Sequence, residues 1–209
     1  MSIRFIYGRS GTGKSEYIYK DIKEKINTKE KIYILTPDQF SFMAEKKLLE
    51  IAEEETSLNA EVLTFNRMAY RVFSEVYGAA EVNLSLTGRK MLLYNILLEE
   101  KNNLTFLKNS EGDIDLVSTT ITEFKKHNIT EKQLQENINN IGSTYLKAKL
   151  TDLHLIYAKY NQKIKDKYID ENDKLTLLVE RLEQSSMFKN SLIYIDEFTG
   201  FTRQEYNVI

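Results

Sequence analysis

The chain begins with a repeating pattern in which a short apolar run is followed by hydrophobic residues at helical spacing. β-Branched and aromatic residues dominate the apolar runs, which predicts buried strands, and the spacing of three to four residues between them predicts amphipathic helices. The pattern returns once near the end of the chain. The predicted strands are residues 3–7, 31–35, 61–63 and 192–195, and the predicted helices between the first three are 14–27, about 38–54 and 65–76.

Successive strand–helix units predict a parallel sheet with crossover helices, which is an α/β fold. Local signals support the boundaries. Pro37 suits the first turn of a helix, Thr64 suits an N-cap, and Gly78 follows the last turn of the third helix. Ligands of such sheets bind at the carboxyl ends of the strands, so the connections after the strands are the first places to look for a site.

The middle of the chain, residues 84–189, lacks this pattern and reads as consecutive helices inserted between strands. Thr130 and Gln133 have the spacing of a capping box. Leucine, tyrosine and isoleucine side chains then form an a/d-type stripe from Leu146 to Ile164, which predicts one helix of about 26 residues, or ~39 Å. The stripe fits a helix packed within a bundle, with a seam for a partner chain as the alternative.

Composition narrows the class of protein. The 209 residues are 42% hydrophobic, contain no cysteine and carry a net charge of −2. This is typical of a soluble protein, excludes disulfides and thiolate metal sites, and gives no overall electrostatic signal for nucleic acid. No apolar run approaches 18 residues and no leader precedes the first strand, so we expect a cytoplasmic protein without a membrane-spanning segment.

The strongest chemical signal is the P-loop pattern G-x-x-x-x-G-K-S between the first strand and the first helix. Its three glycines let the chain turn with positive φ and direct backbone N–H groups at one phosphate, near the positive end of a helix. Lys14 would reach the β and γ phosphates of ATP, and the Ser15 hydroxyl would bind Mg²⁺. The predicted nucleotide-binding residues are Gly8, Arg9, Ser10, Gly11, Thr12, Gly13, Lys14 and Ser15.

An acidic pair completes this hypothesis. The strand at 192–195 runs directly into Asp196 and Glu197, as the Walker B element of a P-loop enzyme does. Asp196 would hold Mg²⁺, and Glu197 would be the catalytic base that activates water. Thr202 and Glu205 then form a second capping box, opening a helix that is cut off at Ile209, so we expect the chain to be a fragment of a larger protein.

Several segments resemble superfamily 1 helicases, and more closely the AddB family of bacterial helicase–nuclease subunits. The resemblance lies in both ends of the chain, and 84–165 carries no matching motif. The segments are IRFIYGRSGTGKS (3–15), LTPDQFSFMAEKKLL (35–49), VLTFNRMAYRVF (62–73), YIDENDKLTLL (168–178) and YIDEFTGFTRQEYNVI (194–209). It implies a RecA-like P-loop lobe (1A) made of 1–83 and 190–209, truncated at its carboxyl end, and a 1B-like helical insertion at 84–189.

The same resemblance implies a function. Members of the AddB family pair with an AddA-type subunit, act on double-strand ends and single-stranded DNA in recombinational repair, and take part in recognising Chi. Thr199 and Gly200 stand where active helicases have Gln-Asp, and the glutamine-bearing segment that precedes the P-loop in active helicases is missing, which implies nucleotide binding without motor activity. The family's 4Fe–4S nuclease domain lies far downstream, and a chain without cysteine cannot hold that cluster.

Residues after the second and third strands are candidates for contacting DNA, because these connections face the ligand side and aromatic rings stack on bases. Core packing is the alternative for each aromatic ring. A P-loop nucleoside or small-molecule kinase is the competing enzyme class, disfavoured by the Asp-Glu pair and by the lack of an arginine-dense lid, and a scaffold with a vestigial site is the third interpretation. The DNA candidates are Asp38, Gln39, Phe40, Phe65, Asn66 and Arg67.

Overall fold

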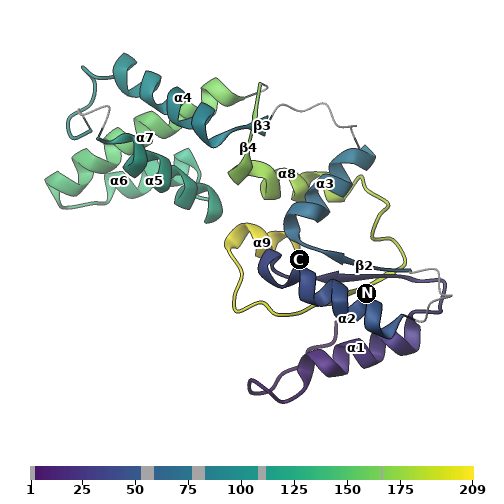
Figure 1. Cartoon of the computed structure of the whole chain (residues 1–209). Coiled ribbons are helices and arrows are strands. Elements are labelled where there is room, and N and C mark those ends of the chain that lie inside the picture. Colours follow the sequence, from purple (N-terminus) through teal and green to yellow (C-terminus); the bar gives the residue numbers. More distant parts are fainter. Residues whose placement is uncertain (1–2, 53–58, 77–82, 108–111, 166) are drawn as a thin grey trace. The chain divides into compact units, whose positions relative to one another are not determined.

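The computed structural model describes residues 3–52, 59–76, 83–107, 112–165 and 167–209. Contacts divide the chain into two compact units (Figure 1). The first, which we call the sheet unit, is Met1–Gly78 with Arg181–Phe201. The second, the helical unit, is Ala79–Glu180 with Thr202–Ile209. Each is built around its own hydrophobic core.

The sheet unit contains a three-stranded parallel sheet in the order β2-β1-β5. Its strands are β1 (Lys31–Leu35), β2 (Ala60–Leu63) and β5 (Ser191–Ile195). The central strand, β1, places Ile32 opposite Ala60 on one side and opposite Leu192 on the other. The α/β fold and three of the predicted strands are confirmed. Because all three run parallel, their carboxyl ends meet at one edge.

Helices cover both faces of this sheet (Figure 1). α1 (Lys14–Lys25) and α2 (Ser41–Ile51) pack on the face to which Ile32 and Ile34 point. Alternate residues point to the other face, where Tyr33 meets the Phe188 ring at 5.0 Å and where α3 (Phe65–Val76) lies. A short 3₁₀ turn, η1 (Asp38–Phe40), joins β1 to α2. The predicted Thr64 cap is confirmed by a hydrogen bond from the Arg67 N–H to Thr64 Oγ1 at 3.3 Å, whereas Gly78 lies outside the described residues.

The predicted strand at residues 3–7 is wrong. This segment has no regular secondary structure, and the side chains of Ile3, Phe5 and Tyr7 are 71%, 81% and 92% exposed. Within the described residues β5 pairs only with β1. A strand needs a neighbour to satisfy its backbone N–H and C=O groups, and the apolar composition that suggested a strand here does not supply one.

The helical unit holds most of the remaining helices. Two capping boxes predicted from sequence are confirmed, with Thr130 and Gln133 opening α6 and Thr202 and Glu205 opening α9. The elements assigned mainly to this unit are β3 (Asn83–Leu84), α4 (Leu86–Glu99), α5 (Ile114–Lys126), α6 (Glu131–Asn139), α7 (Thr144–Ile164), β4 (Ile169–Asp170), η2 (Glu171–Asp173), α8 (Lys174–Leu182) and α9 (Arg203–Val208). The short parallel pair β3–β4 was not predicted.

α7 is the long helix predicted from the a/d stripe, but it has 21 residues rather than about 26. It starts at a Ser143 cap and ends at Ile164, because the chain then turns towards β4. Leu153, Tyr157 and Tyr160 from the stripe are buried in the core with side chains of α4, α5 and α6. The stripe therefore packs within a helical bundle, as the first of the two interpretations held.

A cluster of buried charges ties α4, α5 and α7 of the helical unit to β4 and η2. Asp170, 2% exposed, accepts a hydrogen bond from the Tyr160 hydroxyl at 2.6 Å. Its carboxylate lies 3.2 Å from Lys125 Nζ and 3.7 Å from Arg89 Nη1, and Lys125 also bonds Asp173. Burial alone would raise the pKa of Asp170, but Lys125, Tyr160 and Arg89 hold that pKa below its ordinary value.

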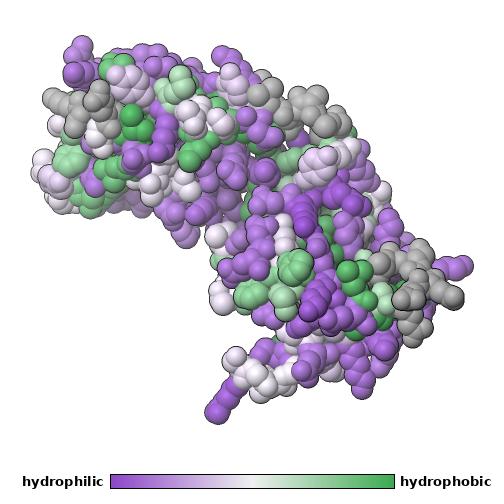
Figure 2. All heavy atoms as spheres, viewed as in Figure 1, coloured by the Kyte–Doolittle hydropathy of each residue, from purple (hydrophilic) through white to green (hydrophobic). Residues whose placement is uncertain are grey.

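The surface of each unit is mainly polar. Figure 2 shows hydrophilic side chains over most of the visible face, interrupted by separate hydrophobic patches. Among the described residues, no helix is both long enough and apolar enough to cross a membrane.

Candidate nucleotide site

The loop before α1 has a backbone that favours glycine at specific positions. Gly11 and Gly13 have φ of 77° and 81°, in the left-handed region, and Gly13 is the N-cap of α1. Gly8 serves differently from the sequence prediction, because its requirement is close approach rather than positive φ. A Cβ built at Gly8 would lie 2.7 Å from Thr12 Oγ1. The loop therefore curls tightly in front of the amino end of a helix, where backbone N–H groups favour an anion.

The Lys14 side chain folds back over this loop. Its ammonium donates hydrogen bonds to the carbonyl oxygens of Gly8, at 3.1 Å, and Arg9, at 2.9 Å. The Thr12 hydroxyl donates to the same Arg9 carbonyl at 2.8 Å. The positive charge is thus held inside the curve of the loop, beside the helix N-terminus, where the two favour negative charge together.

The acidic pair lies directly beside the loop. The Ser15 hydroxyl donates to Glu197 Oε1 at 3.3 Å, although the two residues are 182 positions apart. The Asp196 N–H donates to the Leu35 carbonyl at 3.1 Å, which extends the β1–β5 ladder by one residue. Glu197 has φ of 65°, a conformation that costs a non-glycine residue free energy and that occurs preferentially at functional sites.

A polar network holds α1 against β5. The Tyr194 hydroxyl and the Lys25 ammonium each lie 2.6 Å from Asp21 Oδ2 and donate to it. These two hydrogen bonds lower the pKa of Asp21, while burial and the Asp21 carboxylate raise the pKa of Tyr194 to about 12. Because Tyr194 lies two residues before Asp196, the network fixes the acid-bearing strand relative to the helix that begins at the loop.

A second network anchors the segment that leads into β5. Glu75, on α3, accepts hydrogen bonds from the hydroxyl groups of Ser185 and Ser186 and from the Ser186 N–H, the last at 3.0 Å. Hydrogen bonds from Ser185 and then Ser186 lower the pKa of Glu75 to about 2. No sequence pattern indicates this contact, since nothing in a glutamate and two serines so far apart in the chain predicts that they meet.

The chemistry of these residues fits a magnesium-bound nucleotide. Among the described residues no group of three or more His, Cys, Asp or Glu side chains is placed to hold a metal ion. Mg²⁺ at phosphate sites takes most of its ligands from water and phosphate and only one or two from the protein. The Ser15 hydroxyl and the carboxylate pair beside it are therefore a sufficient protein contribution.

The candidate DNA residues fall on two neighbouring connections. Asp38 and Gln39 are exposed on η1, and Asn66 and Arg67 are exposed on the first turn of α3. Asn66 Nδ2 donates to Asp38 Oδ2 at 3.4 Å, so the two connections touch.

Three of the candidates are less free to meet a ligand. Arg67 pairs with Glu45 on α2. Phe65 is 8% exposed and lies edge-on to Phe198 with ring centroids 5.6 Å apart, which is the core-packing alternative, whereas Phe40 is partly buried.

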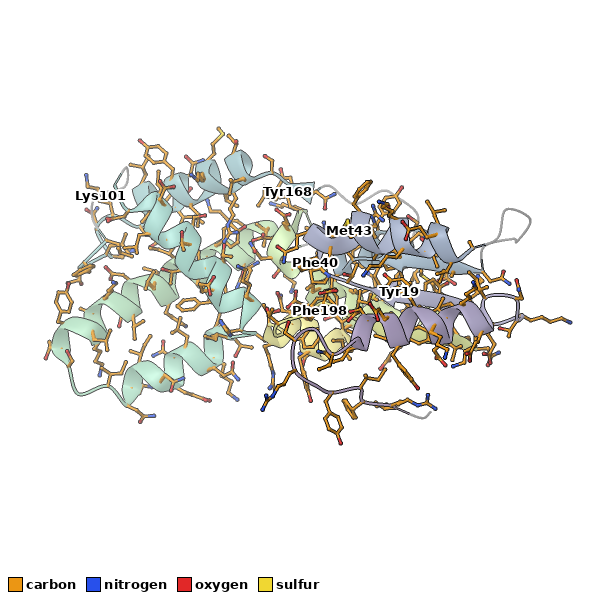
Figure 3. The ribbon with its side chains drawn as sticks, turned by 60° about the horizontal axis from the view of Figure 1, so that its bottom comes forward. Tyr19, Phe40, Met43, Lys101, Tyr168 and Phe198 are labelled. Carbon is orange, nitrogen blue, oxygen red and sulfur yellow. The ribbon has the colours of Figure 1, made fainter. Side chains whose placement is uncertain are left out.

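A small pocket beside the acidic pair was not predicted. Tyr19 of α1, Phe40 of η1 and Met43 of α2 lie close together in Figure 3 and line it. Lys47 Nζ lies 5.3 Å from the centre of the Tyr19 ring. Burial, then the charges of Asp196 and Glu197, raise the pKa of Tyr19 to about 12. Helical spacing placed Tyr19 on α1, but only the tertiary structure shows that it faces the acids.

Comparison with known proteins gives a consistent result. A family model described as "ADDB, N-terminal" matches residues 5–209. The whole chain is 46% identical to the B subunit of an ATP-dependent helicase/deoxyribonuclease from Clostridium botulinum (strain Loch Maree / Type A3) and 44% identical to proteins of the same name in Clostridium tetani (strain Massachusetts / E88) and Thermoanaerobacter sp. (strain X514). It spans 19% of the length of each. The chain belongs to the AddB family and corresponds to its amino-terminal domain.

Proposed function

We propose that the sheet unit is the nucleotide-binding, RecA-like 1A lobe of an AddB-type protein. Residues 8–15 bind the phosphates of ATP, Ser15 and Asp196 hold Mg²⁺, and Glu197 orients or deprotonates the attacking water. The observation that carries this proposal is the 3.3 Å contact between Ser15 and Glu197, because it joins the loop and the strand-end acids into one site.

Within this proposal Mg²⁺ would neutralise charge on the phosphates, and the residues of the chain would position it. The Lys14 ammonium already lies inside the loop and needs only to turn from the Gly8 and Arg9 carbonyls to reach phosphate oxygens. The Asp21–Tyr194 hydrogen bond keeps loop and acids in register. The site thus supplies orientation and charge, which are the main contributions of protein to phosphoryl transfer.

The remaining parts of the chain would serve DNA processing. We place the boundaries of the lobe at 1–83 and 190–209 and assign 84–189 to a 1B-like insertion. Asp38, Gln39, Phe40, Phe65, Asn66 and Arg67 would lie near single-stranded DNA, with Phe65 acting from the core. The relatives are named as one subunit of an ATP-dependent helicase/deoxyribonuclease, which supports action on DNA ends, an AddA-type partner, and a part in Chi recognition.

A nucleotide-binding assay tests the central claim. A fluorescent ATP analogue with Mg²⁺ should bind the wild-type chain, and Lys14→Ala should weaken binding roughly tenfold or more, equivalent to at least about 1.4 kcal/mol. Lys20→Ala is the matched control, since Lys20 is exposed on the same helix. Equal affinity of wild type and Lys14→Ala would show that the loop holds no nucleotide.

DNA binding is tested separately by titrating single-stranded DNA at several salt concentrations. A lobe that contacts the phosphate backbone should lose affinity linearly in the logarithm of salt concentration. A small-molecule kinase would show little binding at any salt concentration, and that result would contradict the assignment to DNA processing.

A further inference from the structure

The Thr36 hydroxyl is buried without a partner. Thr36 directly follows β1 and is 1% exposed, and its N–H donates to the Leu63 carbonyl at 3.0 Å. Its Oγ1, in contrast, has no hydrogen-bond partner among the residues that the structure describes. Thr64 occupies the matching position after β2, is also buried, and its Oγ1 accepts from the Arg67 N–H. Buried hydroxyl groups are nearly always hydrogen-bonded, so Thr36 needs an explanation.

Thr36 lines the small pocket beside the acidic pair. The volume of this pocket is about 20 Å³, which is enough for one water molecule and too little for a larger ligand. Backbone and side chains from β1, η1, α1, α2 and the end of β5 enclose it (Figure 3). The lining residues that carry polar side-chain groups are Tyr19, Thr36, Lys47, Asp196 and Glu197.

The chemistry of this lining suits water better than a cation. A buried water makes two to four hydrogen bonds to polar groups that would otherwise lack partners. Here Thr36 supplies a hydroxyl and the acidic pair supplies carboxylate oxygens, while the Lys47 ammonium, 5.3 Å from the centre of the Tyr19 ring, adds positive charge that disfavours a second cation. Carboxylates and a hydroxyl can share the two protons of one water.

We propose that one buried water links Thr36 Oγ1 to the carboxylates of the Asp196–Glu197 pair, and that Thr36 is a positioning residue for those acids. Its catalytic meaning rests on the proposed nucleotide site. Thr36 is followed by Pro37, whose ring restricts φ, and then by η1, which carries Asp38 and Phe40. The water therefore connects the segment proposed to meet DNA with the acids proposed to hold Mg²⁺ and water.

A pair of substitutions at Thr36 provides the functional test. Thr36→Val keeps the shape and removes the hydroxyl, whereas Thr36→Ser keeps the hydroxyl. In the full chain, Thr36→Val should raise the Mg²⁺ concentration needed for half-maximal binding of the ATP analogue about tenfold, as loss of an outer-sphere partner does, and Thr36→Ser should restore it. A midpoint that is the same in wild type and Thr36→Val would overturn the positioning role.

Two measurements that need no nucleotide test the water itself. A crystal structure should show a water within hydrogen-bond distance of Thr36 Oγ1 and of one carboxylate oxygen of the pair. Thr36→Val should lower the melting temperature, because the water loses a partner. An empty pocket, or a higher melting temperature in Thr36→Val, would overturn the inference, since removing a truly unpaired hydroxyl is favourable.

These outcomes separate the inference from the proposed function. Lys14→Ala tests nucleotide binding and leaves the pocket untouched, since Lys14 is not part of its lining. If Lys14→Ala binds the analogue normally while the water is present, the nucleotide site is wrong and the water link stands. If Lys14→Ala abolishes binding while the pocket is dry, the nucleotide site stands and the water link is wrong.

Discussion

The same four residues, Tyr-Ile-Asp-Glu, occur at 168–171 in the helical unit and at 194–197 in the sheet unit. In both places Ile is the last or next-to-last residue of a parallel strand. Asp170 is buried among Lys125, Arg89 and Tyr160, while Asp196 is partly exposed at the end of β5. One acid is fully neutralised by its neighbours and the other remains available to a ligand. The difference lies entirely in what the fold places around the tetrapeptide.

The largest effect that separates the two copies should come from Lys125. Replacing it by Met leaves Asp170 and Asp173 without their main cation, and breaking a buried ion pair in this way costs about 3–5 kcal/mol. Chemical denaturation should show this loss in the free energy of unfolding. Lys126→Met, one residue away and exposed, should change it by less than about 0.5 kcal/mol. Similar values for both variants would mean that the cluster contributes little to stability.

Asn substitutions of the two aspartates should affect different properties. Asp196→Asn should weaken Mg²⁺-dependent binding of an ATP analogue by roughly 10–100-fold while the protein stays folded. Asp170→Asn should do the reverse, lowering stability with nucleotide affinity unchanged in the protein that remains folded. Isothermal titration and denaturation of both variants check this, and an Asp196→Asn protein with full affinity would remove Asp196 from the proposed site.

The two tyrosines give a smaller contrast. Tyr194→Phe removes the hydrogen bond to Asp21 and should cost about 1 kcal/mol. Tyr168 is 45% exposed, so Tyr168→Phe should be close to neutral. Thermal melting of both variants measures the difference. A neutral Tyr194→Phe would show that the network between α1 and β5 does not hold the helix in place.

The two glutamates give the smallest contrast and the only expected gain. Glu197 has positive φ, so Glu197→Gly should relieve strain and raise stability by up to about 1 kcal/mol. Glu171→Gly, within η2, should lower stability by about 0.5–1 kcal/mol. Any ATP hydrolysis by the protein should fall with Glu197→Gly. Loss of stability in that variant would show that contacts of Glu197 outweigh its backbone strain.

Much of the fold could be predicted because its signals are local. Strands β1, β2 and β5, helix α3 and the caps at Thr130 and Thr202 depend on propensity, periodicity and short-range hydrogen bonds. Segment 3–7 and the pair β3–β4 depend instead on which backbone lies alongside, and composition does not encode this. Similarly, α2 was expected to carry Phe42 and Leu49, yet these are 72% and 63% exposed while Ala44 and Leu48 are buried.

The candidate site divides in the same way. The loop at 8–15 and the acids at 196–197 were visible as motifs, and the structure places Ser15 beside Glu197. Thr36, Tyr19 and Lys47 carry no motif, because their relation to the acids arises only when β1, α1 and α2 pack together. The Asp170 cluster was equally hidden, since burial of a charge with its partners depends on contacts between residues far apart in the chain.

The parallel pair β3–β4 bears on the order in which the protein is assembled. It sets Asn83 opposite Ile169 and so brings the two ends of the intervening segment together. On the ribosome, this segment is complete before Ser191–Ile195 emerges, and its early collapse shortens the effective tether between β1 and β5, although the saving in loop entropy is small, about 0.6 kcal/mol per halving of length. Until then β1 presents an unpaired edge, a site where a nascent chain can misassociate.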